Sequence, residues 1–513
     1  MLTPFYLLNA PERVVGLYSE LEEYIIHDIA RRLAKTGKLT STAAYQAARA
    51  KELGTAKANI AKEVAYTLDA SEKYISQTLY DATMDSLEAD DTLYKKAGKS
   101  PTPPQQSRYI QNYIKAMSRQ TQGEMKNFTR SMGFQTATGF KKVAQYYQHA
   151  LDFAHLKITT GATDYNTAIR QAVKEISDSG LRFVDYKSGW VNRADVAVRR
   201  AVLAGIQQTA GHLAEMRADE MGVSTMEITA HAGARPSHAV WQGQIVDRSG
   251  QDSRFLTLDD IGYGTGDGFK GWGCRHDWAP FIPGISVPSY TPEQLKNIDP
   301  PPVEYNGKTY TYYEATQRQR QIETAIRKTK REIIAYDGAG DKDMFTAKSI
   351  LLRRQREEYA AFSKAAGLRT KPERAGVLGY GHSESVKAVW AERKEVSKYE
   401  KIRYNKDGTI VVTDDWTGKG KVSVPREYKP NAVVDTKTVY KDGSEQIDRS
   451  IYGADAMLKK QIHSGPHNRP KAHPYGQQGE HGHDYEWADD GSKRSRTVRE
   501  LTDREKKEHK DLL

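Results

Sequence analysis

The chain of 513 residues has a single cysteine and lacks any long apolar stretch. One cysteine excludes an intrachain disulfide and any metal site of the Cys-x-x-Cys kind. No run of about 18 apolar residues occurs, so we expect no membrane-spanning helix and no membrane partner. The first residues have neither a basic n-region nor an apolar h-region, and we therefore expect no signal peptide. A secreted scaffold held together by disulfides is excluded.

Motifs of nucleotide-driven and acyl-transfer enzymes are also missing. The sequence contains no phosphate-binding loop of the form GxxxxGK followed by Ser or Thr, and no GxSxG nucleophile elbow. Residues 266–271 match GxGxxG in letters, but a turn and prolines follow them instead of a helix, so we reject a dinucleotide site. We expect no cofactor and no small-molecule substrate, and the chain is no ATP-driven motor.

Positive charge is in excess along the chain. Lys and Arg total 77 and Asp and Glu total 66, which gives a formal net charge of +11. This balance allows a polyanionic partner but does not identify one. Hydrophobic residues make up 38% of the sequence, enough for several small cores. The composition favours an extended, helix-rich multidomain chain over one compact globule.

Residues 1–180 are expected to be a mostly helical N-terminal region, because apolar residues recur there at helical spacing. One short helix is expected from Ser41 to Gly54, and a separate one from Ser71 to Gly98. The apolar stripes are narrow, and the other faces are rich in Gln, Lys, Tyr and Asp. Such helices pack on their neighbours in a thin layer and do not build a thick catalytic core.

Three further parts are expected after this region. In residues 181–300, a helix and a strand precede a stretch crowded with Gly, Trp, His and Pro, which predicts an α+β domain with a long ordered loop. In residues 301–375, charged helices flank a turn at 337–341, which predicts a coiled-coil-like helical hairpin. Residues 376–513 contain two hairpin-turn sequences and predict a small α+β C-terminal appendage with a His-rich segment.

One face of the predicted helical hairpin is strongly basic. The residues on this face are Arg318, Arg320, Arg327, Lys328 and Arg331. A basic helical face is most often a solvated surface. Lys and Arg side chains can also contact DNA phosphates without sequence preference. Both interpretations stay open, and these five residues are the candidates for DNA contact.

Histidine, cysteine and tryptophan are concentrated in the central domain. His231, His238, Cys274 and His276 offer the imidazole and thiolate ligands that zinc binds. However, His-x6-His and Cys-x-His are not the spacings of standard structural zinc sites. The alternative is a loop fixed by hydrogen bonds from His and Arg, with tryptophans packed beneath it. The spacings favour this packed loop, and the four residues are weak metal candidates only.

Six of the fourteen histidines lie between positions 463 and 509. The candidate residues of this segment are His463, His467, His473, His481, His483 and Tyr485. One interpretation is a metal-independent nuclease in which histidines act as general acid and base. A second is a metal site formed by His481, His483 and Asp484. The third is a polar, Gly-rich surface segment whose histidines only form hydrogen bonds. No pattern here fixes a reaction, so no catalytic residue is assigned.

The order of these features resembles a family of phage proteins. An N-terminal Leu-Thr-Pro and a long helical region precede a motif made of His231, Gly233, Arg235, His238, Trp241, Gly243, Cys274, Arg275 and His276. Over about residues 1–340 the chain is similar to minor capsid (head morphogenesis) proteins of tailed bacteriophages, specifically the phage minor capsid protein 2 family. The central block is similar to the minor head protein of Mu-like phages.

The resemblance implies a structural role. It implies a component of the virion interior near the portal vertex, assembled in the host cytoplasm. The implied partners are the portal protein, the major capsid or scaffolding protein, and double-stranded DNA contacted non-specifically during assembly or ejection. The family supplies no catalytic residues, so the motif residues are expected to be structural. Some minor head proteins carry C-terminal extensions similar to small nucleases or toxins, and a capsid-carried nuclease effector is therefore the alternative.

Overall fold

The computed structural model describes residues 1–36, 42–159, 165–184, 189–372, 374–377, 402–419, 422–440, 443–467, 473–487 and 493–513. They form two compact units, each assembled from separated segments of chain. Unit 1 comprises Met1–Ile25, Leu39–Thr159 and Asp178–Arg318, and unit 2 comprises Ile26–Lys38, Thr160–Ser177 and Gln319–Leu513. Helices and several small sheets occur, which confirms the predicted multidomain mix of α and β structure. Among the described helices, none combines the length and the apolar character needed to cross a bilayer.

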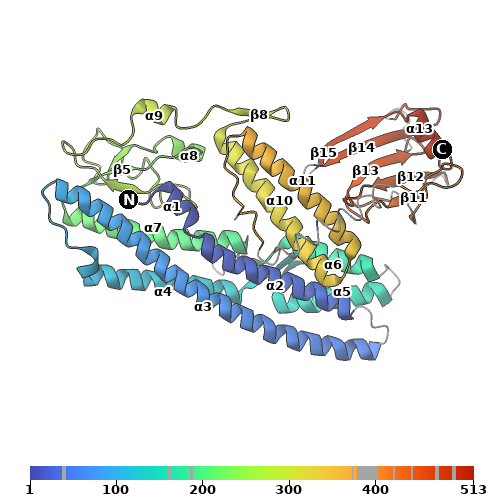
Figure 1. Cartoon of the computed structure of the whole chain (residues 1–513), viewed down its shortest axis with the longest axis horizontal. Coiled ribbons are helices and arrows are strands. Elements are labelled where there is room, and N and C mark those ends of the chain that lie inside the picture. The colour runs from blue at the N-terminus through green and yellow to red at the C-terminus, as the bar shows by residue number, and fades with distance from the viewer. Residues whose placement is uncertain are drawn as a thin grey trace. The chain divides into compact units, whose positions relative to one another are not determined.

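Long helices dominate the first part of unit 1 (Figure 1). They are α1 (Pro4–Asn9), the first half of α2 (Glu12–Thr36), α3 (Thr42–Lys96), η1 (Pro104–Gln106), α4 (Arg108–Arg130), α5 (Val143–Thr159) and α7 (Ala194–Glu220). One apolar cluster joins α3, α4 and α7. It contains Met84 and Leu87 of α3, Ile110 and Ile114 of α4, and Leu213 of α7, all buried. This three-helix contact is the framework on which the central domain is built.

The helix α3 is one continuous helix of 55 residues, where the sequence predicted two. Gly54 and Ser71 lie inside it and do not mark its ends. A glycine inside a helix costs about 1 kcal/mol relative to alanine, which packing can offset. The hydroxyl of Ser71 donates to the Leu68 carbonyl at 2.9 Å, so its polar group is satisfied within the helix. The packing of α3 against α4 and α7 therefore outweighs both local signals.

The helices α4 and α7 approach closely at one glycine. A Cβ atom added to Gly205 of α7 would lie 2.5 Å from Thr121 Oγ1 of α4. Side chains do not tolerate so short a contact, so the absence of a side chain at 205 sets the distance between the two helices. Thr121 itself is buried.

Unit 1 also contains a small antiparallel sheet that the sequence did not predict. Its strands are β1 (Met132–Thr136), β2 (Gly139–Lys142), β3 (Arg182–Val184) and β4 (Val191–Arg193), in the order β2-β1-β3-β4. Phe183 of β3 stacks on Phe128 of α4 with ring centroids 5.1 Å apart, and Tyr18 of α2 meets the same ring edge-on. The sheet thus packs against α2 and against the end of α4.

The central domain is a three-stranded antiparallel sheet covered by a long loop. The strands are β5 (Thr225–Ile228), β6 (Ile245–Asp247) and β7 (Trp278–Pro280), in the order β6-β5-β7. The short elements around them are α8 (Pro236–Ala239), α9 (Pro292–Lys296), β8 (Val303–Tyr305) and β9 (Lys308–Tyr310). A core that includes Trp241, Phe269, Cys274 and Trp278 packs on the sheet. This agrees with the predicted α+β domain and its ordered loop.

Unit 2 contains the end of α2, the helix α6 (Tyr165–Ser179) as far as residue 177, and a helical hairpin. The hairpin consists of α10 (Tyr312–Ala339), whose first residues belong to unit 1, and α11 (Lys342–Ala365), as predicted. Gln319 of α10 donates to Ser363 Oγ of α11 at 2.9 Å. At the turn, Arg170 of α6 forms two hydrogen bonds with Asp341, the N-cap residue of α11.

The C-terminal part of unit 2 is a six-stranded sheet (Figure 1). Its strands follow chain order: β10 (Asp414–Lys419), β11 (Val433–Val439), β12 (Glu445–Tyr452), β13 (Leu458–His463), β14 (His481–Trp487) and β15 (Lys493–Arg499). The pair β10–β11 is parallel, and the other neighbours are antiparallel. Within the described strands, β15 is an edge strand. The helix α13 (Asp503–Glu508) follows it, and the predicted small α+β domain is present.

Candidate functional site

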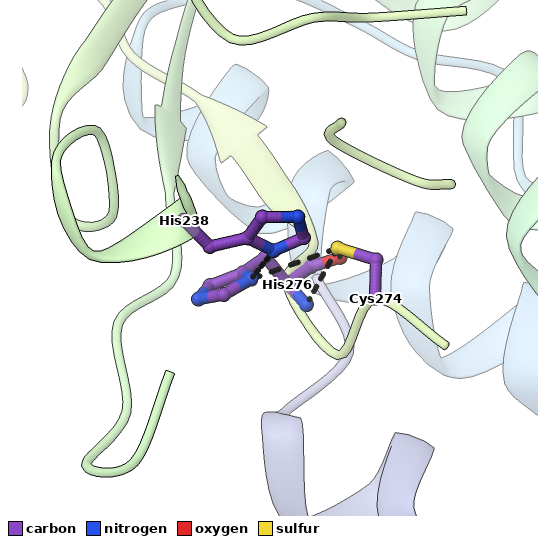
Figure 2. A group of neighbouring side chains, drawn as sticks. All are labelled: His238, Cys274 and His276. Carbon is purple, nitrogen blue, oxygen red and sulfur yellow. Dashed lines mark hydrogen bonds between the residues drawn. The ribbon is translucent and has the colours of Figure 1, made fainter. Parts of the chain in front are cut away.

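The four weak metal candidates of the central motif meet in unit 1. His238 lies on α8, and Cys274 and His276 lie just before β7 (Figure 2). The Nδ1 atoms of His238 and His276 are 3.3 Å apart, and Cys274 Sγ is 3.6 Å from His276 Nδ1. The ring of His231 stacks on that of His276 with centroids 4.6 Å apart. The sequence therefore identified residues that form one spatial cluster.

Contacts with the surrounding loop occupy ring nitrogens of this cluster. His238 Nε2 lies 2.8 Å from the Asp267 carbonyl oxygen, and His276 Nε2 lies 3.3 Å from Gln242 Oε1. His231 Nδ1 lies 2.8 Å from the carbonyl oxygen of the next residue. A metal ion would have to displace some of these contacts. They are the contacts expected of a packed structural cluster, and a metal site here stays a prediction.

Burial keeps the same cluster uncharged at neutral pH. It lowers the pKa of His276 to about 2 and, together with the charge of Arg275, the pKa of His231 to about 4. Burial also lowers the pKa of His238 and raises the pKa of the Cys274 thiol. The thiolate is the form of cysteine that binds metal. A protonated thiol among neutral imidazoles is typical of a packed interior.

The remaining motif residues fix the loop to the sheet. Gly233 and Gly243 both have a φ of +69°, a region that favours glycine. Arg235 donates from Nη2 to the Trp272 carbonyl oxygen at 2.7 Å, and Arg275 donates to the Gly233 carbonyl oxygen at 3.4 Å. The two arginines thus hold the backbone of the loop. This geometry fits the structural role that the resemblance implied.

A cavity of about 820 Å³ lies beside this loop. Its walls come from α4, α7 and the glycine-rich segment 263–273, and they include Tyr113 and His212, whose rings stack with centroids 4.7 Å apart. A Cβ atom at Gly268 would lie 2.0 Å from the Gly262 carbonyl oxygen, so the segment folds tightly on itself. No sequence pattern predicted this cavity; repeated glycines are a signal of close backbone contact that could have pointed to the tight segment.

The five C-terminal histidines converge on one face of the six-stranded sheet. His463 ends β13, His481 and His483 lie on β14, and His467 and His473 lie in the connection between these strands. The ring centroids of His463 lie 4.5 Å from His467, 4.8 Å from His481 and 4.4 Å from His483. His473 stacks on His481 at 4.3 Å. His463, His481 and His483 are buried. The interpretation as a surface segment is therefore wrong for these three residues.

Residues outside the predicted set hold this cluster in place. Asp448 Oδ1 on β12 lies 3.0 Å from His463 Nδ1. Arg496 Nη2 on β15 lies 2.8 Å from His483 Nδ1. The spacing of these two residues gave no signal in the sequence, because only the pairing of the strands brings them to the histidines.

Burial also lowers the pKa values of three histidines of this cluster. The pKa falls to about 4 for His467 and His481, and to about 2 for His483, which also lies near Arg496. Neutral imidazole therefore predominates near pH 7 in these three side chains. In that state the rings can bind metal ions, but they are poor general acids.

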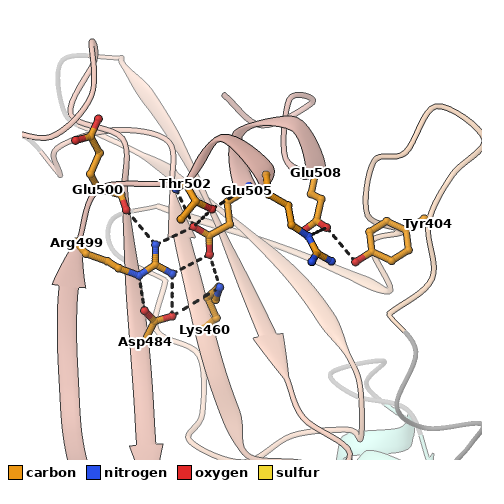
Figure 3. Close-up of polar contacts among 9 residues, drawn as sticks. Tyr404, Lys460, Asp484, Arg499, Glu500, Thr502, Glu505 and Glu508 are labelled. Carbon is orange, nitrogen blue, oxygen red and sulfur yellow. Dashed lines mark hydrogen bonds and ion pairs between the residues drawn. The ribbon is translucent and has the colours of Figure 1, made fainter.

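The third predicted ligand, Asp484, lies on the other face of β14, because successive side chains of a strand alternate. There it pairs with Arg499, with Oδ2 2.5 Å from Nε, and Arg499 also contacts Glu505 (Figure 3). The metal hypothesis is wrong for this residue. Tyr485 is on the histidine face of β14, and its hydroxyl donates to Gln461 Oε1 at 2.5 Å.

The candidates for DNA contact are unevenly placed around α10. Arg320 is exposed, and Arg318, Arg327 and Lys328 are partly exposed. Arg331 is 2% exposed, so the expectation that it lies on the outer face is wrong. Arg327 donates from Nη1 to the carbonyl oxygen of Arg374 at 3.0 Å. The basic face is thus partly solvated and partly packed.

Comparison with known proteins identifies the class of protein. The chain is 23% identical over 269 residues to a structural protein of Lactococcus phage LL-H, covering 51% of this chain and 69% of that relative. It is 29% identical over 101 residues to a structural protein of Lactococcus phage mv4, covering 20% of this chain and 73% of that relative. No solved structure is significantly similar. The resemblance is to structural proteins of bacteriophage virions.

The family is established by a match over residues 2–363. The chain belongs to the family described as phage minor capsid protein 2, as its motifs indicated. The match includes the long helices, the central His/Cys cluster and nearly all of the helical hairpin. The six-stranded sheet and its histidines lie beyond it.

Proposed function

We propose that this virion structural protein is a minor head protein that binds the portal inside the capsid and contacts packaged DNA without sequence preference. The observation that carries the proposal is the family match over residues 2–363. Long helices with narrow apolar faces suit contact with other head proteins, and the major capsid or scaffolding protein is a further proposed partner. In this proposal the central His/Cys cluster has a structural role in the central domain.

Charge supports the proposed DNA contact. The net charge of +11 favours association with a polyanion. Arg318, Arg320, Arg327 and Lys328 all have solvent-accessible area on α10, whereas Arg331 is left out because it is buried. Contacts from Lys and Arg to phosphates release counterions, so the affinity should fall steeply as salt rises.

The DNA contact is tested with the full chain and duplex DNA by fluorescence anisotropy at several salt concentrations. A triple variant, Arg318→Gln, Arg320→Gln and Lys328→Gln, should weaken binding and reduce the salt slope by about one unit per lost phosphate contact. The matched control, Lys51→Gln, Lys57→Gln and Lys62→Gln, removes three exposed charges from α3 and should change the slope less. Equal effects of both variants, or binding independent of salt, would contradict the proposal.

The portal contact is tested by co-purification of the full chain with the portal protein and by quantitative mass spectrometry of assembled particles. We expect retention in particles at a copy number far below that of the major capsid protein, and loss from particles that lack the portal. Retention without the portal would show that another head protein recruits the chain.

A second candidate function is nucleic-acid cleavage by the C-terminal sheet. The observation that favours it is the convergence of five histidines with Arg496 beside them. The full chain would be incubated with RNA and with DNA, with and without added metals. Cleavage should disappear in the double variant His481→Ala and His483→Ala and persist in His212→Ala, which changes an exposed histidine of α7. No cleavage by the unaltered chain under any condition would exclude this function.

A further inference from the structure

We propose that the C-terminal sheet carries a binding site for a divalent transition-metal ion, with His463, His467 and His481 as its ligands. The site lies outside the family match, which ends at residue 363. It is independent of the proposed portal and DNA contacts. The three side chains offer ligand atoms that all lie within 4.8 Å of one another.

The strand register places the site at one position of the sheet. Asp448 of β12 pairs with His463 of β13, and His463 pairs with His481 of β14. Side chains at paired positions of neighbouring strands project to the same face. His467 approaches from the connection after β13, with its ring 4.5 Å from that of His463 and 5.5 Å from that of His481. Two strands and one loop thus converge on a single point.

The contacts of two rings leave one nitrogen of each available. His463 Nδ1 lies 3.0 Å from Asp448 Oδ1, and His481 Nδ1 lies 2.8 Å from the Gly479 carbonyl oxygen. A carboxylate or carbonyl beside Nδ1 is the usual support of a histidine that binds metal through Nε2. The Nε2 atoms of His463 and His481 are buried and have no hydrogen-bond partner among the described residues. Buried polar atoms without a partner are rare, and an ion would satisfy both.

The distances fit an empty site that contracts on binding. Nitrogen ligands lie about 2.0–2.1 Å from zinc in tetrahedral sites, which puts neighbouring ligand atoms about 3.4 Å apart. Here the ligand atoms are separated by up to 4.8 Å. Side-chain rotations that shorten these separations by roughly an ångström would complete the site.

Another group of three histidines shares His481 but fits less well. It consists of His473, His481 and His483. Arg496 Nη2 lies 2.8 Å from His483 Nδ1, so a positive charge already occupies that ring's environment. A cation beside the guanidinium would be repelled. In the group formed by His463, His467 and His481, the charged neighbour is the carboxylate of Asp448, which would attract a cation. This group is therefore the preferred site.

The ligand chemistry selects the class of metal. Imidazole suits zinc, nickel and copper, whereas magnesium and calcium require oxygen ligands. An ion bound here would cross-link β13, β14 and the connection between them. In a chain with a single cysteine, such an ion supplies a cross-link that a disulfide cannot provide.

The site is tested by zinc titration of the metal-free full chain, with calorimetry and elemental analysis of the dialysed protein. We expect binding of zinc that is lost in His463→Ala and in His481→Ala. Two controls should retain it: His212→Ala, on an exposed position of α7, and Cys274→Ala, in the central His/Cys cluster. No zinc uptake by the unaltered chain, or unchanged stoichiometry and affinity in both histidine variants, would overturn the proposal.

A second measurement separates loss of metal from loss of folding. Asp448→Asn keeps the size of the side chain but removes the charge beside His463, and it should weaken zinc binding about 10- to 100-fold. The melting temperature of the metal-free variant should stay close to that of the unaltered chain. Cobalt substitution should give visible absorption bands of nitrogen coordination without the thiolate charge-transfer band that a Cys274 site would show. Unchanged affinity in Asp448→Asn, or a thiolate band, would contradict the assignment.

Discussion

Lys348 of α11 forms a buried ion pair with Glu427, a residue that precedes β11 of the C-terminal sheet. The same ammonium group lies 2.9 Å from Glu332 Oε2 of α10. Glu427 also accepts a hydrogen bond from Lys174 of α6 at 3.0 Å. The side chains of Lys348 and Glu332 are almost fully buried, so four segments of unit 2 are joined by one ionic cluster.

Replacing Lys348 should therefore strongly destabilise the folded chain. The variant Lys348→Met leaves two buried carboxylates without their shared cation, and such changes cost about 3–5 kcal/mol of unfolding free energy. Urea unfolding followed by circular dichroism measures the loss. The matched control is Lys73→Met, which removes an exposed i,i+4 pair with Asp69 and should change stability little. Similar effects of both substitutions would contradict a role for burial.

The stabilisation by Glu427 should depend on pH in a defined direction. Burial alone would raise the pKa of this carboxyl group, but Lys348 and Lys174 outweigh burial and lower it from 4.5 to about 2. Because the folded-state pKa is lowered, the stabilisation is fully present above the unfolded pKa. It is lost as the pH falls through the folded pKa. The difference in melting temperature between the unaltered chain and Glu427→Gln should be constant near neutral pH and shrink below about pH 5. A difference that grows in acid would exclude this carboxylate as the source.

The close approach of α4 and α7 predicts opposite effects for two helical glycines. Gly205→Ala brings a methyl group against Thr121 and should destabilise the chain by about 1–3 kcal/mol, as overpacking does. Gly123→Ala meets no atom within 4 Å and should stabilise it by about 0.5–1 kcal/mol, because alanine favours the helix. Thermal unfolding compares the two. The double variant Gly205→Ala and Thr121→Ala should recover part of the loss, and no recovery would mean that the contact is not the cause.

Cys274 should be chemically silent in the folded chain. The thiol is 1% exposed, and burial raises its pKa, so neither access nor thiolate favours reaction. Ellman's reagent should detect no thiol in the native chain near pH 8 and one thiol per chain in denaturant. The single cysteine makes the measurement unambiguous. Rapid reaction in the native state would show that the His/Cys cluster opens.

Helical periodicity predicted some elements of this chain and missed others. The spacing of apolar and charged residues predicted the hairpin of α10 and α11. It divided α3 wrongly, since Gly54 and Ser71 resemble helix ends and only the neighbouring helices show that the helix continues. The strands β1 to β4 are three to five residues long and were missed for want of any periodic pattern.

The sequence identified most residues of the candidate sites but did not predict how those residues are arranged in space. Strand alternation could have shown that His481 and His483 share a face from which Asp484 is excluded. The pairing of Asp448 with His463 and of His463 with His481 depends on the register of three strands, which no local pattern determines. The burial of Arg331 likewise depends on packing around α10. For the histidine cluster and for Arg331, contacts between distant segments determine the arrangement, and local sequence does not.

The edge strand β15 has a consequence for how two copies of the chain can meet. Lys493 and Arg496 project from this strand and are exposed, and Arg499 lies further along it. An unpaired edge is a template for a strand of another copy, and positive charges along it oppose such pairing. Two copies of the chain would meet like charge against like charge at this edge. The exposed basic residues Lys493 and Arg496 therefore disfavour pairing of this edge with a second copy of the sheet.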